Sequence, residues 1–143
     1  MSSIVLDASV AVKWFSSPGQ ETLVEEAAAI GERYQAGEIS LVVPDLFWAE
    51  VANYFWKGVQ QHRFAPGIAH TSIEMLRSQN FPTIPSFDLI DQALHIALAF
   101  KRSAYDSIYI ALAMQLGTHL ITADERLANA VGIRLPVKWL GML

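Results

Sequence analysis

The chain has 143 residues, of which 52% are hydrophobic and 17% are charged. An average soluble domain has about 25% charged residues. This composition excludes a disordered chain and allows one domain with a substantial core. The absence of cysteine excludes disulfides and zinc–thiolate sites, and no apolar run approaches the ~18 residues of a membrane span. The net charge of −4 argues against a protein that binds nucleic acid through an overall positive field. We expect one soluble domain over residues 1–143, located in the cytoplasm.

Short apolar segments rich in β-branched residues alternate with segments of helical periodicity. In chain order we expect a strand at 4–6, helices at 10–15 and 23–34, a strand at 40–43, helices at 46–61 and 68–77, a strand at 81–85, helices at 86–101 and 104–116, a strand at 119–122, a helix at 125–131 and a strand at 137–139. Buried strands that alternate with helices are typical of a parallel sheet covered on both faces. The predicted fold class is therefore α/β, a three-layer α/β/α sandwich with a short central parallel sheet.

The predicted helix at 86–101 begins at Ser86, whose hydroxyl is suited to an N-cap. Phe87, Ile90, Leu94 and Ala97 follow at helical spacing. We expect this apolar stripe to face the core.

Aromatic residues occur on more than one face of the predicted helix at 46–61. Core packing accounts for Phe47 and Tyr54, whereas Trp48, Phe55 and Trp56 point in other directions. These three residues fit a partner groove or a dimer contact as well as they fit further core packing. Because the chain is rich in apolar and poor in charged residues, we expect an oligomer or a permanent partner.

Four carboxylates lie where ionised side chains are costly. Asp7 and Asp124 each follow an apolar strand, and ligands of parallel α/β sheets bind outside the carboxyl ends of the strands. Glu50 and Asp106 lie on the apolar faces of their predicted helices. A carboxylate on such a face loses hydration and needs a partner. We expect all four to lie at one end of the sheet or to face it.

Each of these residues also has a purely structural interpretation. Asp7 and Asp124 are possible helix N-caps, and Glu50 is a possible partner of a lysine. Asp106 in a first helical turn interacts favourably with the helix macrodipole. Taken singly, the structural interpretation is preferred for Asp7 and Asp124, and only the convergence of all four favours a site.

Four ionised carboxylates carry a charge that two divalent cations would cancel. Oxygen ligands suit Mg²⁺ and Mn²⁺, which bind through carboxylates and substrate phosphates. Two such ions stabilise the attacking and leaving oxygens of an in-line phosphoryl displacement. The arrangement therefore suits phosphodiester hydrolysis, and bound cations would reverse the local charge that argues against nucleic acid binding.

The four carboxylates lie in four short motifs, which are Val5 to Trp14 (VLDASVAVKW), Pro44 with Glu50-Val51-Ala52-Asn53, Tyr105 to Ala113 (YDSIYIALA) and Thr122 to Leu127 (TADERL). These motifs resemble the successive motifs of PIN domains, and most of all those of the VapC-type toxins of bacterial and archaeal toxin–antitoxin pairs. Each motif alone is weak, but the four together, in the right order, are specific. The resemblance covers essentially the whole chain.

The resemblance implies a Mg²⁺- or Mn²⁺-dependent ribonuclease. In such enzymes a metal-activated water attacks the scissile phosphate and leaves a 5′-phosphate and a 3′-hydroxyl. The residues that would bind metal and carry catalysis are Asp7, Glu50, Asp106 and Asp124.

Further positions follow from the same motifs. Ser9 and Thr122 fall where small hydroxyl residues orient the carboxylates or a water, and Asn53 lies one turn after Glu50, where it can act similarly. Ser107 stands where alanine is commoner, a departure that we expect to leave catalysis unaffected.

Four basic residues lie near the acidic residues in the sequence. Lys13, Lys101, Arg102 and Arg126 can hold RNA phosphates, although surface charge or an ion pair explains each equally well. Lys13 is the strongest candidate because it follows Asp7 through a short helix.

The resemblance also implies partners. VapC-type toxins commonly form homodimers, and a cognate antitoxin protein holds them inactive by covering hydrophobic surface and the site. Their substrate is RNA, with tRNA as one candidate.

Two other functions fit parts of the pattern. One is a catalytically silent PIN-like module that binds RNA or a partner, which the intact set of four carboxylates disfavours. The other is a receiver-type signalling module, which also places Asp and Mg²⁺ at strand ends. Such a module predicts a phosphoacceptor aspartate at the end of a central strand and a lysine near the last strand. Lys138 fits the lysine, but the expected middle strands end at Pro44 and Pro85 rather than at an aspartate.

Overall fold

Our computed structural model describes residues 2–17 and 19–143, and within them five parallel strands form one sheet. The sheet order is β3-β2-β1-β4-β5. The strands are β1 (Ser2–Leu6), β2 (Ile39–Pro44), β3 (Thr83–Ile84), β4 (Leu120–Thr122) and β5 (Val137–Trp139). The α/β prediction is confirmed, but the expectation that the strand ending at Pro85 is a middle strand was wrong, because β1 is central and the short β3 lies at an edge.

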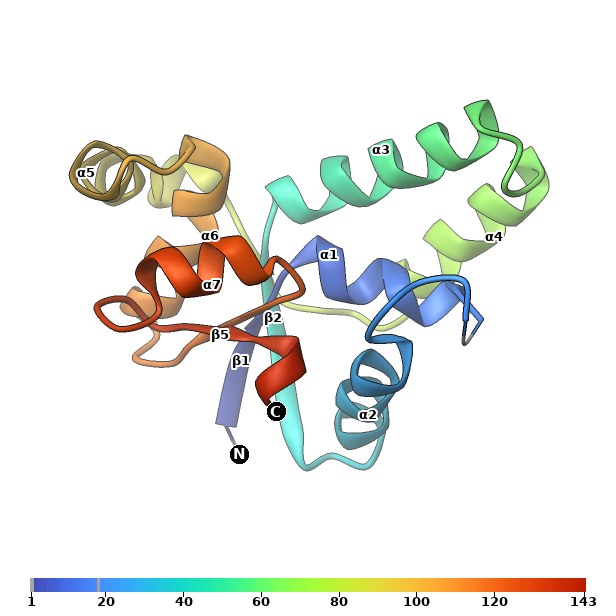
Figure 1. The fold of residues 1–143 in the computed structure, drawn as a ribbon, viewed down its shortest axis with the longest axis horizontal. Helices are drawn as coiled ribbons and strands as arrows, with labels where there is room; N and C mark the ends of the chain where they lie inside the picture. Colours follow the sequence, from blue (N-terminus) through green and yellow to red (C-terminus); the bar gives the residue numbers. More distant parts are fainter. Residues whose placement is uncertain (1, 18) are drawn as a thin grey trace.

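The helices follow the strands and cover both faces of the sheet. They are α1 (Ala8–Ala11), α2 (Val24–Gln35), α3 (Leu46–Gln60), α4 (Pro66–Arg77), α5 (Ile90–Phe100), α6 (Ala104–Gln115) and α7 (Glu125–Val131), with 3₁₀ turns η1 (Val12–Phe15), η2 (Ser86–Asp88) and η3 (Leu140–Met142). Figure 1 shows α5 and α6 on one side of β1 and β2, with α1 and α2 on the other side. The three-layer arrangement is therefore present.

Helix α6 contains the longest uninterrupted run of buried residues among the helices of the described chain. Every residue from Ser107 to Ala113 is buried, and α6 contacts β1, β2 and β4 on one side and α5 on the other. A helix that is apolar all round belongs inside a protein. The first turn of α6, which carries Asp106, is consequently held in a fixed position relative to the sheet.

The expected start and inner face of the helix at 86–101 were both wrong. Ser86 belongs to the 3₁₀ turn η2, its side chain caps no helix, and α5 begins after Leu89. Phe87 is 86% exposed, and Ile90 and Leu94 also face solvent. The residues that this segment buries are instead Leu89, Ala93 and Ile96. Because α5 carries two apolar faces, periodicity alone does not identify the inner one.

The aromatic residues of α3 divide differently from the expectation. Phe55 is buried in the core, and Trp48 packs on Phe47 while its indole N–H donates to Thr83 Oγ1 at 3.1 Å. Only Trp56, at 58% exposure, is left for a partner.

No helix of the described residues has the length and apolar character needed to cross a bilayer.

Candidate active site

Asp7 and Asp124 lie at the same edge of the sheet because they follow the adjacent parallel strands β1 and β4. Both residues also cap helices. Asp7 Oδ1 accepts a 3.4 Å hydrogen bond from the Ser9 N–H, and Asp124 Oδ1 accepts one of 3.1 Å from the Leu127 N–H. A capping carboxylate keeps lone pairs for other ligands, so the structural and functional interpretations are compatible.

Buried Thr122 connects these two acidic residues. Its hydroxyl donates a 2.6 Å hydrogen bond to Asp7 Oδ2 and accepts a 3.0 Å hydrogen bond from the Asp124 N–H. Ser9 Oγ accepts a 3.1 Å hydrogen bond from the Ala123 N–H. The two hydroxyl residues therefore fix the segment after β4 against the segment after β1.

Glu50 comes from α3 and is held from across the site by α6. The buried Tyr109 hydroxyl donates a 2.6 Å hydrogen bond to Glu50 Oε1. Among the described residues Glu50 forms no ion pair with a lysine, so that structural interpretation was wrong. Burial, with the nearby charges of Asp7 and Glu50, raises the pKa of Tyr109, which keeps the phenol protonated as a donor.

Asp106 lies in the first turn of α6, half-buried. Ser103 Oγ caps this helix by accepting a 3.0 Å hydrogen bond from the Asp106 N–H. The position is favourable for a negative charge because of the helix macrodipole. The neighbouring Arg102 lowers the pKa of Asp106, but burial and the charge of Asp124 raise it more.

The charges of the four carboxylates act on one another. Burial raises the pKa of Asp7, and the charge of Asp106 raises it further. Burial likewise raises the pKa of Glu50, to which Asp7 and Asp106 add. Together with the effect of Asp124 on Asp106, these shifts link all four residues in one electrostatic group. The group therefore needs positive charge.

The residue types fit a divalent cation, although the side chains do not form a complete ligand cage. No three Asp, Glu or His side chains of residues 2–17 and 19–143 approach closely enough for a ready metal-binding group. The four carboxylates offer oxygen ligands only, and a bound cation would relieve the repulsion among their negative charges. Because Mg²⁺ keeps several of its waters, it does not require an all-protein cage.

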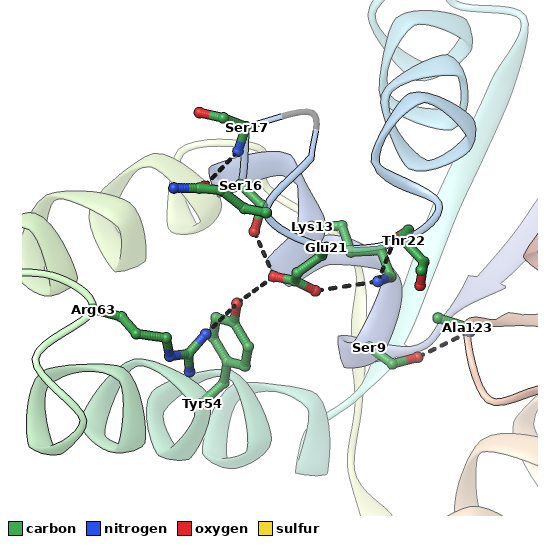
Figure 2. Close-up of polar contacts among 10 residues, drawn as sticks. Ser9, Lys13, Ser16, Ser17, Glu21, Thr22, Tyr54, Arg63 and Ala123 are labelled. Atoms are coloured by element: carbon green, nitrogen blue, oxygen red, sulfur yellow. Dashed lines mark hydrogen bonds and ion pairs between the residues drawn. The ribbon is translucent and has the colours of Figure 1, made fainter.

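Lys13 does not lie where RNA could reach it, so this expectation was wrong. Its side chain is buried, with 7% of the residue exposed. The ammonium group donates to Glu21 Oε1 at 3.1 Å and to the Thr22 carbonyl at 2.7 Å (Figure 2). Its charge is therefore engaged inside the protein.

The other expected residues are close in sequence to the acidic residues. Asn53 is exposed on α3, one turn after Glu50, and Arg126 is exposed on α7, two residues after Asp124. Arg102 is half-buried, and its Nε donates to the Lys101 carbonyl at 3.2 Å.

Sequence reasoning missed two polar contributors. The sequence does not single out Tyr109, yet its hydroxyl holds Glu50. It does not single out Glu21 either, yet this residue lies before α2 and accepts hydrogen bonds from Lys13, Ser16 and Tyr54. The spacing of Tyr109 three residues after Asp106 was the one available signal, since it places both on one face of α6.

A model of the PIN domain family matches residues 4–133. Among curated proteins, Ribonuclease VapC9 of Mycobacterium tuberculosis is 29% identical over 134 residues, which cover 94% of this chain and 95% of that protein. Among solved structures, PAE2754 from Pyrobaculum aerophilum superposes with a TM-score of 0.72 at 20% identity, over 99% of this chain and 85% of that one. A toxin–antitoxin complex from Klebsiella pneumoniae contains a chain with a TM-score of 0.64 at 20% identity, over 94% of this chain and 95% of that one. The chain therefore belongs to the PIN domain family.

Proposed function

We propose that this protein is a Mg²⁺- or Mn²⁺-dependent endoribonuclease, the toxin of a VapBC-type toxin–antitoxin pair. The observation that carries the proposal is the convergence of acidic residues from four separate segments. Thr122 holds both Asp7 Oδ2 and the Asp124 N–H, and Tyr109 of α6, the helix that carries Asp106, holds Glu50. The repulsion among these carboxylates, which raises the pKa of Asp7, Glu50 and Asp106, is costly unless a bound cation compensates it. The similarity to Ribonuclease VapC9 supports RNA as the substrate, and an RNA substrate fits a cytoplasmic enzyme.

The four carboxylates would hold the cation. When bound, such a cation would supply positive charge at the scissile phosphate and would lower the pKa of a water molecule. Thr122 holds Asp7 Oδ2 and Tyr109 holds Glu50 Oε1, which fixes the orientation of two of the four side chains. Hydrolysis by water would leave a 5′-phosphate and a 3′-hydroxyl.

The surrounding residues position the carboxylates and the RNA. Ser9 fixes the loop before Asp124 through the Ala123 N–H, and exposed Asn53 orients ligands from α3. Arg102 and Arg126 lie beside Asp106 and Asp124 in the chain, where they contact phosphates of the RNA backbone.

A cognate antitoxin is the expected protein partner. The solved structure from Klebsiella pneumoniae is a toxin–antitoxin complex, and its similar chain spans nearly the length of this one. An antitoxin that covers the acidic site would block access of RNA, which is how the pair would stay inactive.

The outer face of η2 and α5 supports a homodimer. Phe87, Ile90, Leu94 and Leu98 are all exposed there at helical spacing. An apolar stripe along one helix is self-complementary across a two-fold axis. Light scattering should give a dimer for the wild type and a monomer for Leu94→Glu; a monomeric wild type would contradict the proposed homodimer.

The strand order does not exclude the receiver-type alternative, since central strand β1 ends directly before Asp7. Membership of the PIN domain family leaves that alternative without support. The silent PIN-like module is an outcome of the following experiment.

The direct test is cleavage of purified tRNA by the full chain with Mg²⁺ or Mn²⁺ and with a chelator. We expect cleavage only with the cation and products with a 5′-phosphate. Asp106→Asn should abolish cleavage while circular dichroism shows a retained fold. Absence of cleavage of tRNA and of total cellular RNA, under every cation, would favour the silent module.

A further inference from the structure

A pocket of about 370 Å³ lies beside the acidic site, between the segment that follows η1 and the middle of α3. Phe15, Tyr54 and Phe64 supply its aromatic walls, and Glu21 and Arg63 supply its charged groups. Figure 2 shows the side chains of Ser16, Tyr54 and Lys13 directed toward Glu21. The pocket therefore combines flat apolar surfaces with a negatively charged acceptor and a positively charged donor.

The acceptor is fixed in place. Glu21 Oε2 accepts hydrogen bonds from the Ser16 hydroxyl at 2.5 Å and from the Tyr54 hydroxyl at 2.7 Å, and Oε1 accepts from buried Lys13 at 3.1 Å. Burial raises the pKa of Glu21, but these hydrogen bonds outweigh that effect and lower it. The carboxylate is thus ionised at neutral pH, and Oε1 keeps lone-pair capacity for a further donor.

The donor is a flat cation stacked on aromatic rings. The guanidinium carbon of Arg63 lies 5.2 Å from the ring centroid of Tyr54 and 5.5 Å from that of Phe64. Its Nη1 donates to the Tyr54 hydroxyl at 3.5 Å. Guanidinium planes and aromatic rings are the surfaces on which proteins stack unpaired RNA bases.

The pocket lies next to the acidic group along the same two elements. Tyr54 follows Glu50 by one turn of α3 and shares its face. Phe15 ends the η1 segment that continues from α1, which Asp7 caps. A strand with a phosphate at the carboxylates would therefore bring an adjacent nucleotide to the pocket.

We propose that this pocket binds one unpaired, amino-bearing base of single-stranded RNA, adjacent to the scissile phosphate. The carboxylate of Glu21 repels a phosphate but accepts a hydrogen bond from an exocyclic amino group. The base ring stacks on Arg63 and the aromatic walls. This inference rests on the proposed ribonuclease function and adds a specificity determinant to it.

The test is binding rather than cleavage. Fluorescently labelled tetranucleotides of adenosine or of uridine, without divalent cations, are titrated with the full chain and with Arg63→Ala and Arg63→Lys. Arg77→Ala is the matched control, because Arg77 is also exposed but pairs with Glu74 on α4. Thermal melts verify that each variant is folded.

We expect the wild type to bind the adenosine tetranucleotide about tenfold more tightly than the uridine tetranucleotide, which is within the range of one stacked base. Arg63→Ala should remove this preference, and Arg63→Lys should not restore it, because lysine keeps the charge without the plane. Arg77→Ala should bind as the wild type does.

Equal affinity for both tetranucleotides would overturn the proposal. Full recovery by Arg63→Lys would also overturn it, since it would indicate a phosphate contact. If Arg77→Ala lost the base preference as fully as Arg63→Ala, the proposal would also be overturned, because such a result would indicate general charge attraction. None of these results depends on cleavage, so each of them would leave the ribonuclease proposal intact. Conversely, absent cleavage with a preserved base preference would contradict the ribonuclease proposal alone.

Discussion

The hydroxyl of Thr122 donates a 2.6 Å hydrogen bond to Asp7 Oδ2, although 115 positions separate the two residues in the chain. Thr122 Oγ1 also accepts a hydrogen bond from the Asp124 N–H. One buried side chain thus sets the relative position of two acidic residues. Removal of this hydroxyl should lower both the free energy of unfolding and the affinity for a cation.

Replacement of Thr122 by valine keeps the shape and deletes the hydroxyl. The buried Asp7 carboxylate then loses its donor, which should lower the free energy of unfolding by about 1–3 kcal/mol. Loss of an orienting partner should weaken cation affinity about 10- to 100-fold. Thermal melts in a Mn²⁺ titration measure both effects. Thr71→Val on exposed α4 is the control, and equal affinities in the two variants would refute this role of Thr122.

Replacement of Tyr109 by phenylalanine should release Glu50. The lost hydrogen bond goes to a charged group, so we expect a loss of about 1.5–3 kcal/mol in the free energy of unfolding. RNA cleavage should fall at least about tenfold, because an orienting contact to a proposed ligand is lost. Tyr105→Phe alters an exposed phenol of the same helix and should leave cleavage unchanged. Unchanged cleavage in Tyr109→Phe would show that Glu50 needs no such support.

Asp106→Asn should stabilise the cation-free protein while abolishing cleavage. The pKa of Asp106 is raised in the folded state by burial and by Asp124, so its ionised form destabilises the fold. This cost is absent below the ordinary pKa of aspartate and grows as the pH rises through the raised pKa. In chelator, the variant should therefore melt higher than the wild type at neutral pH, with a difference that shrinks under acid conditions. A variant that melts lower at neutral pH contradicts the account.

Ser107 offers a test that is independent of catalysis. Its hydroxyl is buried and has no hydrogen-bond partner among the described residues. Ser107→Ala should raise the free energy of unfolding by about 1 kcal/mol or more, with cleavage unchanged. Ser72→Ala is the matched control, since the Ser72 hydroxyl, on a residue that is also buried, donates to the Ile68 carbonyl at 2.8 Å and its loss should not stabilise. Urea unfolding measures both.

The local periodicity of apolar residues was sufficient to predict most helices and strands of the fold. Helical and strand periodicity placed β1, α3, α6 and β4 close to their observed bounds, because burial imposes these periods directly on the sequence. It failed for α5, where two apolar faces compete for the core and only tertiary packing selects Leu89 over Phe87.

The proposed site was partly accessible by the same reasoning. Parallel strands bring their carboxyl ends together, so Asp7 and Asp124 could be expected at one edge. The partner of a long side chain is not encoded by spacing, however. Lys13 reaches Glu21 and Tyr109 reaches Glu50 only through the folded packing of separate segments.

Calorimetric titration of the chelator-treated protein with Mn²⁺, beside Asp106→Asn, tests the central idea most directly. The account predicts saturable binding by the wild type and binding at least about tenfold weaker in the variant. Equal binding by both proteins, or none by the wild type at millimolar Mn²⁺, would contradict a cation site formed by these four carboxylates.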